Sequence, residues 1–89
     1  MADTLQIRPA VLKFAATMEL KLRTNDHKPG WEHKDDEYCL RRARQELEEL
    51  QEASDTANFV GIIEEAADVA NFVMMMSDNA MHALADEGR

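Results

Sequence analysis

The sequence predicts an all-α protein, a small bundle of three to four helices whose core is completed by oligomerisation. Apolar residues recur every three or four positions in three separate segments, which is the spacing of one face of an α-helix. No segment of any length shows the alternation of polar and apolar residues that is typical of a β-strand. The 89 residues are enough for one domain, so we expect a single helical domain over 1–89.

The first predicted helix covers about residues 9–23. Pro9 suits its first turn, because the N–H that proline lacks would have no partner there within the helix. An apolar stripe follows at helical spacing: Val11, Phe14, Ala15, Met18 and Leu22. The polar segment 24–34 comes next, and its Pro29-Gly30 pair predicts a turn.

The second predicted helix covers about residues 37–53, and Asp35 or Asp36 is a candidate N-cap. Its apolar stripe consists of Leu40, Ala43, Leu47 and Leu50. The polar residues 54–56 break this pattern, so we expect the helix to end before them.

The third predicted helix starts near Ala57 or Asn58 and reaches about residue 77. It then either continues to Ala85 or breaks near 77–79 into a fourth short helix. The run 60–76 is apolar nearly all round, which is typical of a helix at the centre of a bundle. Two neighbouring helices cannot cover such a helix, so we expect a homo-oligomer, either a dimer or a dimer of dimers.

The composition excludes several classes of function. A formal net charge of −8 argues against binding to a nucleic-acid polymer, which needs a basic surface. The acids Glu64, Glu65 and Asp68 make the run 60–76 a poor membrane span. The single cysteine, Cys39, excludes an internal disulfide framework, and residues 1–7 lack the pattern of a signal peptide. Both features favour the cytoplasm.

Two pairs of carboxylates, each separated by one helical turn, are the candidate functional residues. Glu46 and Glu49 lie on the second predicted helix, and Glu65 and Asp68 lie on the third. Residues at this spacing share a helix face, and oxygen ligands of this kind bind hard cations. The pair on the third helix is the more informative, because its neighbours are apolar and buried acids are costly without compensation. Without apolar neighbours, a pair of carboxylates on an acidic helix most often lies on a face that is exposed to solvent.

The type of donor favours Mg²⁺, with Mn²⁺ as the alternative, since all four side chains offer oxygen. A di-iron bundle would need Glu-x-x-His pairs, and no histidine follows Glu46, Glu49 or Glu65 at that spacing. The sequence also has no glycine-rich phosphate loop and no zinc-binding spacing.

At these residues the sequence resembles the MazG-like all-α nucleoside triphosphate pyrophosphohydrolases, especially their short phage-type members. The family pattern is Glu-Glu-x-x-Glu, a spacer, and Glu-x-x-Asp, which aligns with 45–49 and 65–68. The stretches 25–31 and 68–79 are also similar to the phage-type form. Gln45 departs from the pattern. An alternative register, 48–52, matches it in full and would make Glu49 and Glu52 the ligands.

The resemblance implies hydrolysis of a nucleoside triphosphate, with a deoxynucleotide favoured, to the monophosphate and pyrophosphate. Glu46, Glu49, Glu65 and Asp68 would hold the Mg²⁺ that binds the phosphate oxygens. Three further residues are candidates for substrate binding: Lys28 for phosphate, Trp31 for the base and Asn71 for sugar or base. Their alternatives are a solvated lysine, a packed tryptophan and a polar contact between helices. The competing function is a non-catalytic acidic helical module for oligomerisation or interaction.

Overall fold

A computed structural model describes residues 4–88 and contains three helices: α1 (Pro9–Arg23), α2 (Asp36–Asp55) and α3 (Phe59–Glu87). No strand occurs over that range, so the predicted all-α class is confirmed. Residues 1–3 and 89 of the expected domain lie outside the described residues, as does the start of the segment 1–7. None of the helices over 4–88 has both the length and the apolar character needed to cross a membrane.

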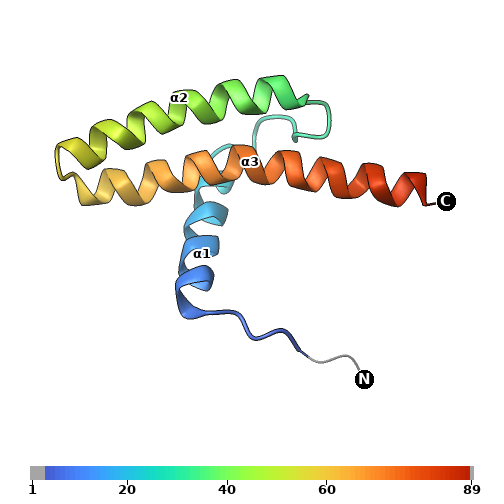
Figure 1. Ribbon diagram of the computed structural model, residues 1–89, viewed down its shortest axis with the longest axis horizontal. Coiled ribbons are helices and arrows are strands. Elements are labelled where there is room, and N and C mark those ends of the chain that lie inside the picture. Colours follow the sequence, from blue (N-terminus) through green and yellow to red (C-terminus); the bar gives the residue numbers. More distant parts are fainter. Residues whose placement is uncertain (1–3, 89) are drawn as a thin grey trace.

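The helices α2 and α3 form an antiparallel hairpin, in which they lie side by side (Figure 1). Asp35 caps α2, since its carboxylate accepts a hydrogen bond from the Tyr38 N–H at 2.8 Å. Asn58 caps α3 in the same way, by accepting from the Gly61 N–H at 3.0 Å. Ala57, in the connection, has a φ of 52°, which is left-handed and outside helical geometry. This explains why α3 begins at Phe59 and not at 57 or 58.

The C-terminal part of α3 continues as one helix past 77–79, so the longer of the two expected alternatives is observed. Asp78 and Asn79 do not interrupt it, because their side chains bind the segment before α2. Asn and Asp side chains disrupt a helix when they compete for its own backbone groups, and here they are engaged elsewhere.

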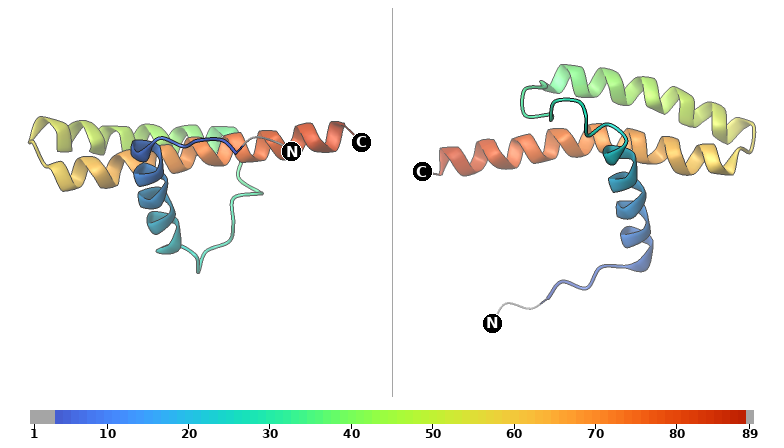
Figure 2. Two further views of the ribbon diagram at one scale, coloured as in Figure 1. Left: turned by 90° about the horizontal axis from the view of Figure 1, so that it is seen from below. Right: turned by 180° about the vertical axis from the view of Figure 1, so that it is seen from behind.

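The helix α1 lies crosswise to the hairpin, and its N-terminal half projects away from it (Figure 1). The view from behind in Figure 2 (right) shows the same projection. Its C-terminal half is attached to α3 by a hydrogen bond from Asn71 Nδ2 to the Met18 carbonyl at 3.1 Å and by an ion pair between Lys21 and Asp68. No residue of α1 is fully buried. Of its predicted apolar stripe, Met18 and Leu22 are half-buried near α3, whereas Val11, Phe14 and Ala15 are exposed.

The hydrophobic core over residues 4–88 is small and consists mainly of small side chains: Cys39, Ala43, Ala53 and Ala67. Large apolar side chains remain exposed on all three helices: Val11, Leu12, Phe14, Leu20, Leu40, Leu47, Phe59, Val60, Ile63, Val73, Met81 and Leu84. The shape is correspondingly extended, with a radius of gyration of 15.2 Å. A compact chain of this length has a radius of gyration of about 12 Å.

Candidate metal centre and adjoining cavity

Three carboxylates meet where α2 and α3 pack together. Glu46 and Glu49 from α2 and Glu65 from α3 each place one oxygen within 4.8 Å of the others. The spacing of one turn brings the two α2 residues to one face of that helix, and the antiparallel hairpin brings Glu65 opposite them. The Glu46 side chain is only 12% exposed, whereas Glu49 is exposed. These three residues, the acidic triad, are three of the four predicted ligands.

Two members of the triad, Glu46 and Glu65, hold their protons more tightly than isolated carboxylates do. Burial raises the pKa of Glu46 from 4.5 to about 8, helped by side-chain hydrogen bonds to Glu49 and Glu65 and by the charges of Glu49 and Asp68. Burial also raises the pKa of Glu65. The pKa of Glu49 is lowered, because it accepts hydrogen bonds from the two neighbours that carry the proton. The triad therefore shares a proton between carboxylates that would otherwise repel one another.

The Oε2 atom of Glu65 is buried and has no hydrogen-bond donor among residues 4–88. Glu46 is better compensated, because its Oε1 lies 3.1 Å from Arg42 Nη2. A proton shared within the triad, a bound water molecule or a cation would satisfy a buried carboxylate oxygen of this kind. An all-oxygen set with an uncompensated buried atom fits a hard divalent cation.

The fourth predicted ligand, Asp68, lies outside the group of three oxygens. Its Oδ2 is 3.4 Å from Lys21 Nζ, and the two side chains are 22% and 31% exposed. It lies close enough to Glu46 for its charge to help raise the pKa of Glu46. Glu52, the ligand in the alternative register, is also outside the group and lines a hollow at the α2–α3 connection with Glu49 and Glu65. The structure thus gathers the ligands of the first register except Asp68.

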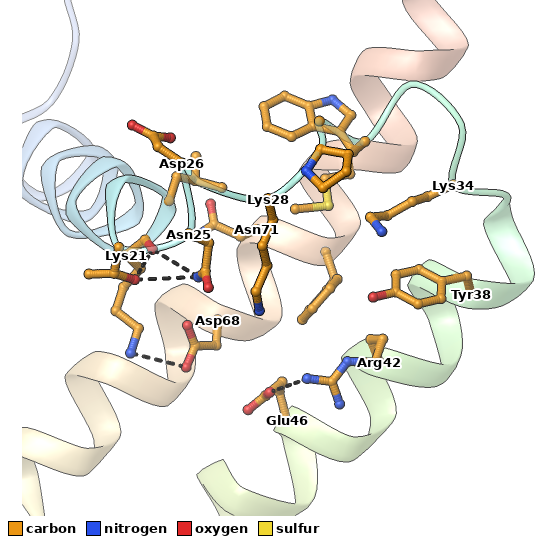
Figure 3. Close-up of a pocket in the computed structure, with 17 residues that line it drawn as sticks. Lys21, Asn25, Asp26, Lys28, Lys34, Tyr38, Arg42, Glu46, Asp68 and Asn71 are labelled. Atoms are coloured by element: carbon orange, nitrogen blue, oxygen red, sulfur yellow. Dashed lines mark hydrogen bonds and ion pairs between the residues drawn. The ribbon is translucent and has the colours of Figure 1, made fainter.

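A cavity of about 630 Å³ adjoins the triad and includes Glu46 and Asp68 in its wall (Figure 3). Four cationic side chains line it: Lys21, Lys28, Lys34 and Arg42. Three aromatic side chains line it as well: Trp31, Tyr38 and Phe72. Figure 3 shows Lys28 reaching into the cavity from the segment above α3. A wall that combines cations with aromatic faces suits a ligand that has phosphate groups and a planar ring.

Of the three aromatic residues in the cavity wall, Tyr38 and Phe72 were not predicted from the sequence. The rings of Tyr38 and Phe72 meet edge to face at 6.3 Å. Lys34 Nζ lies 4.5 Å from the centre of the Tyr38 ring, and the Arg42 guanidinium lies 5.1 Å from that of Phe72. The sequence contains one indication of this wall: Tyr38, Arg42 and Glu46 follow one another at intervals of four residues, which places them on one face of α2.

The remaining predicted substrate residues both line the cavity and both make contacts within the chain. The Trp31 indole N–H donates to Asp78 Oδ2 at 3.0 Å, and the side chain is partly buried. Asn71 is 5% exposed and makes the interhelical contact to Met18. Its Oδ1 is buried without a donor among the described residues. Each residue therefore makes a structural contact and also lies at the candidate site.

Comparison of the chain with protein-family models, with curated proteins and with solved structures gave no match.

Proposed function

We propose that this protein is a Mg²⁺-dependent nucleoside triphosphate pyrophosphohydrolase. The observation that carries the proposal is the acidic triad at the edge of a cavity lined by four cations and three aromatic rings. A triphosphate needs a divalent cation and positive side chains for its charge, and its base needs apolar planar surface. The resemblance to the MazG-like family, with the same carboxylates as metal ligands, supports the same assignment.

In this proposal Glu46, Glu49 and Glu65 hold Mg²⁺, and Mn²⁺ is the alternative ion. The ion would neutralise charge that develops on the phosphate oxygens. Asp68, which is ion-paired with Lys21 in the structure, would be the fourth carboxylate of the set, and Lys21 would then be available to contact phosphate. Lys28 and Arg42 approach the same end of the cavity and would bind further phosphate oxygens (Figure 3). A carboxylate of the set would accept the proton of the attacking water.

The aromatic residues and Asn71 would hold the nucleoside. Trp31, Tyr38 and Phe72 offer ring surface for the base. The Oδ1 atom of Asn71 is buried without a donor among the described residues, and its Nδ2 donates to the Met18 carbonyl. A donor on the sugar or base would satisfy this oxygen.

A screen of the common nucleoside triphosphates with pyrophosphate detection tests the proposal. We expect at least one triphosphate to release pyrophosphate in the presence of Mg²⁺ and none to do so in EDTA. The absence of hydrolysis with every triphosphate, with both Mg²⁺ and Mn²⁺, would contradict the assignment.

The exposed apolar surface favours a second candidate function, a non-catalytic helical interaction module. Such a module needs no divalent ion. Mg²⁺ bound only to the folded state must raise the melting temperature. A protein that is inactive and whose melting temperature does not respond to Mg²⁺ would support the module.

We also propose that the protein is a homo-oligomer, a dimer or a dimer of dimers. The chain has 7195 Å² of accessible surface. A folded monomer of this mass has about 5,300 Å², so each copy carries roughly 1,900 Å² in excess. Covering that excess on two copies would bury roughly 3,800 Å², which lies within the range of obligate dimers.

Sedimentation measures the oligomeric state directly. We expect a dimer or larger species at micromolar concentration, because large apolar side chains of α1 and α3 are exposed within residues 4–88. Leu12→Glu puts a charge on the exposed apolar surface of α1, far from the acidic triad, and should shift the protein toward smaller species. A well-folded wild-type monomer at that concentration would contradict the assembly.

A further inference from the structure

One wall of the cavity is formed by the segment 24–35, which connects α1 to α2 and contains no regular helix or strand. This segment carries two of the proposed substrate residues, Lys28 and Trp31. The position of this segment therefore determines whether this wall of the cavity is present. The origin of that position lies in contacts with α3, at residues to which the proposed function gives no role.

Two consecutive residues of α3 hold the segment. Asp78 Oδ2 accepts the Trp31 indole N–H at 3.0 Å. Asn79 Nδ2 donates to the Trp31 carbonyl at 3.1 Å and lies 3.4 Å from the Lys34 carbonyl. Both residues are partly buried, and neither lines the cavity. They act on the cavity only through the segment that they hold.

The remaining hydrogen bonds of the segment, within the described part of the chain, join residues at most four positions apart. Examples are Asn25 N–H to the Leu22 carbonyl and Lys34 N–H to the Trp31 carbonyl, both at 3.0 Å. Such local bonds shape turns and join the segment to the adjacent end of α1, but they do not fix it to α3. The hydrogen bonds that fix it to α3 are those of Asp78 and Asn79.

We propose that Asp78 and Asn79 are positioning residues of the candidate site, which hold Trp31 in place and with it the cavity wall that carries Lys28. A wall that is already in place needs no ordering when the ligand binds, so this arrangement strengthens binding by lowering its entropic cost. As far as the substrate is concerned, the inference rests on the proposed function. The position of the wall itself does not.

Trp31 is the only tryptophan of the chain, so its fluorescence reports on this wall without any substrate. Asp78→Ala removes the acceptor of the indole N–H and should shift the emission to longer wavelength and increase quenching by acrylamide. Asp78→Asn keeps an oxygen acceptor and should restore wild-type behaviour. Asn79→Ala should act like Asp78→Ala. Ser77→Ala, at an exposed neighbouring position on α3, is the matched control.

Far-UV circular dichroism verifies that each variant keeps its helices. Emission and quenching of folded Asp78→Ala and Asn79→Ala that equal those of the wild type would overturn the proposal.

A second experiment measures the kinetics of hydrolysis with whichever triphosphate the wild type hydrolyses. We expect Asp78→Ala to raise KM by about fivefold, which corresponds to the net contribution of one ordinary hydrogen bond, and to leave kcat within about twofold. A changed fluorescence with an unchanged KM would overturn the link to the site. If the wild type hydrolyses no triphosphate, the proposed function fails, and the fluorescence arm still decides whether Asp78 and Asn79 position the wall.

Discussion

Glu65→Gln should abolish the Mg²⁺-dependent release of pyrophosphate without unfolding the protein, and Asp68→Asn should do the same. Glutamine removes a negative charge from the triad and replaces the buried Oε2, the atom that has no donor among residues 4–88. The loss of charge weakens the hold on the cation but relieves repulsion in its absence. Melting temperatures in EDTA should therefore equal or exceed that of the wild type, while pyrophosphate release falls to background.

Asp68→Asn differs in one respect, because it also breaks the ion pair with Lys21. Both side chains are partly exposed, so we expect this loss to cost at most about 1 kcal/mol of stability. The fold should remain intact while activity disappears.

Two control variants distinguish the triad from its acidic surroundings. Glu48→Gln should change little, since Glu48 is exposed and lies outside the triad. Glu52→Gln should also retain near-normal activity, because Glu52 contributes no oxygen to the acidic triad, although it lines a hollow with Glu49 and Glu65. A loss with Glu52→Gln as deep as that with Asp68→Asn would move the site to the alternative register. Full activity in both Glu65→Gln and Asp68→Asn would show that the metal assignment is wrong.

The stability of the metal-free protein should fall as the pH rises from about 4.5 to about 8. Unfolded Glu46 loses its proton near 4.5, whereas the folded state keeps it until about 8. Between these values the unfolded state binds fewer protons, so the free energy of unfolding decreases with pH. The raised pKa of Glu65 acts in the same direction. The lowered pKa of Glu49 adds stability with rising pH, but only around and below 4.5.

Thermal unfolding in EDTA across this pH range measures the effect. Glu46→Gln should flatten the curve, since glutamine does not titrate. Mg²⁺ should also flatten it, because the ion binds the deprotonated carboxylates and becomes a stronger ligand of the triad as the pH rises. A metal-free stability that increases steadily from pH 5 to 8 would contradict the shared proton.

The helices could be predicted from the sequence because each carries an apolar repeat and a local N-terminal signal. The sequence offered Asp35 or Asp36 as the N-cap of α2, and Asp35 is observed in that role. The end of α2 and the start of α3 were each misplaced by about two residues. The cause is Ala57, a residue type that gives no signal for a left-handed conformation. The sequence left open whether α3 continues past its polar positions 77–79. The contacts that accommodate these residues come from a distant segment and are not visible in the local sequence.

That Glu46 and Glu49 share one face of α2 was also predictable from their spacing, and Glu65 was expected to join them together with Asp68. The pairing of Asp68 with Lys21 was not predictable, since it depends on how α1 crosses α3. Nothing in the local sequence encodes that angle. For the same reason the bond between Trp31 and Asp78, which joins residues 47 positions apart, emerges only from the folded chain.

The measurement that tests the central claim most directly is product analysis by ³¹P nuclear magnetic resonance, with the triphosphate that the screen selects. With wild-type protein and Mg²⁺ we expect the nucleoside monophosphate and pyrophosphate to form in equal amounts. The same mixture with Glu65→Gln should keep its triphosphate. Orthophosphate and nucleoside diphosphate as the products, or equal rates of hydrolysis with wild type and Glu65→Gln, would contradict a pyrophosphohydrolase that acts through the acidic triad.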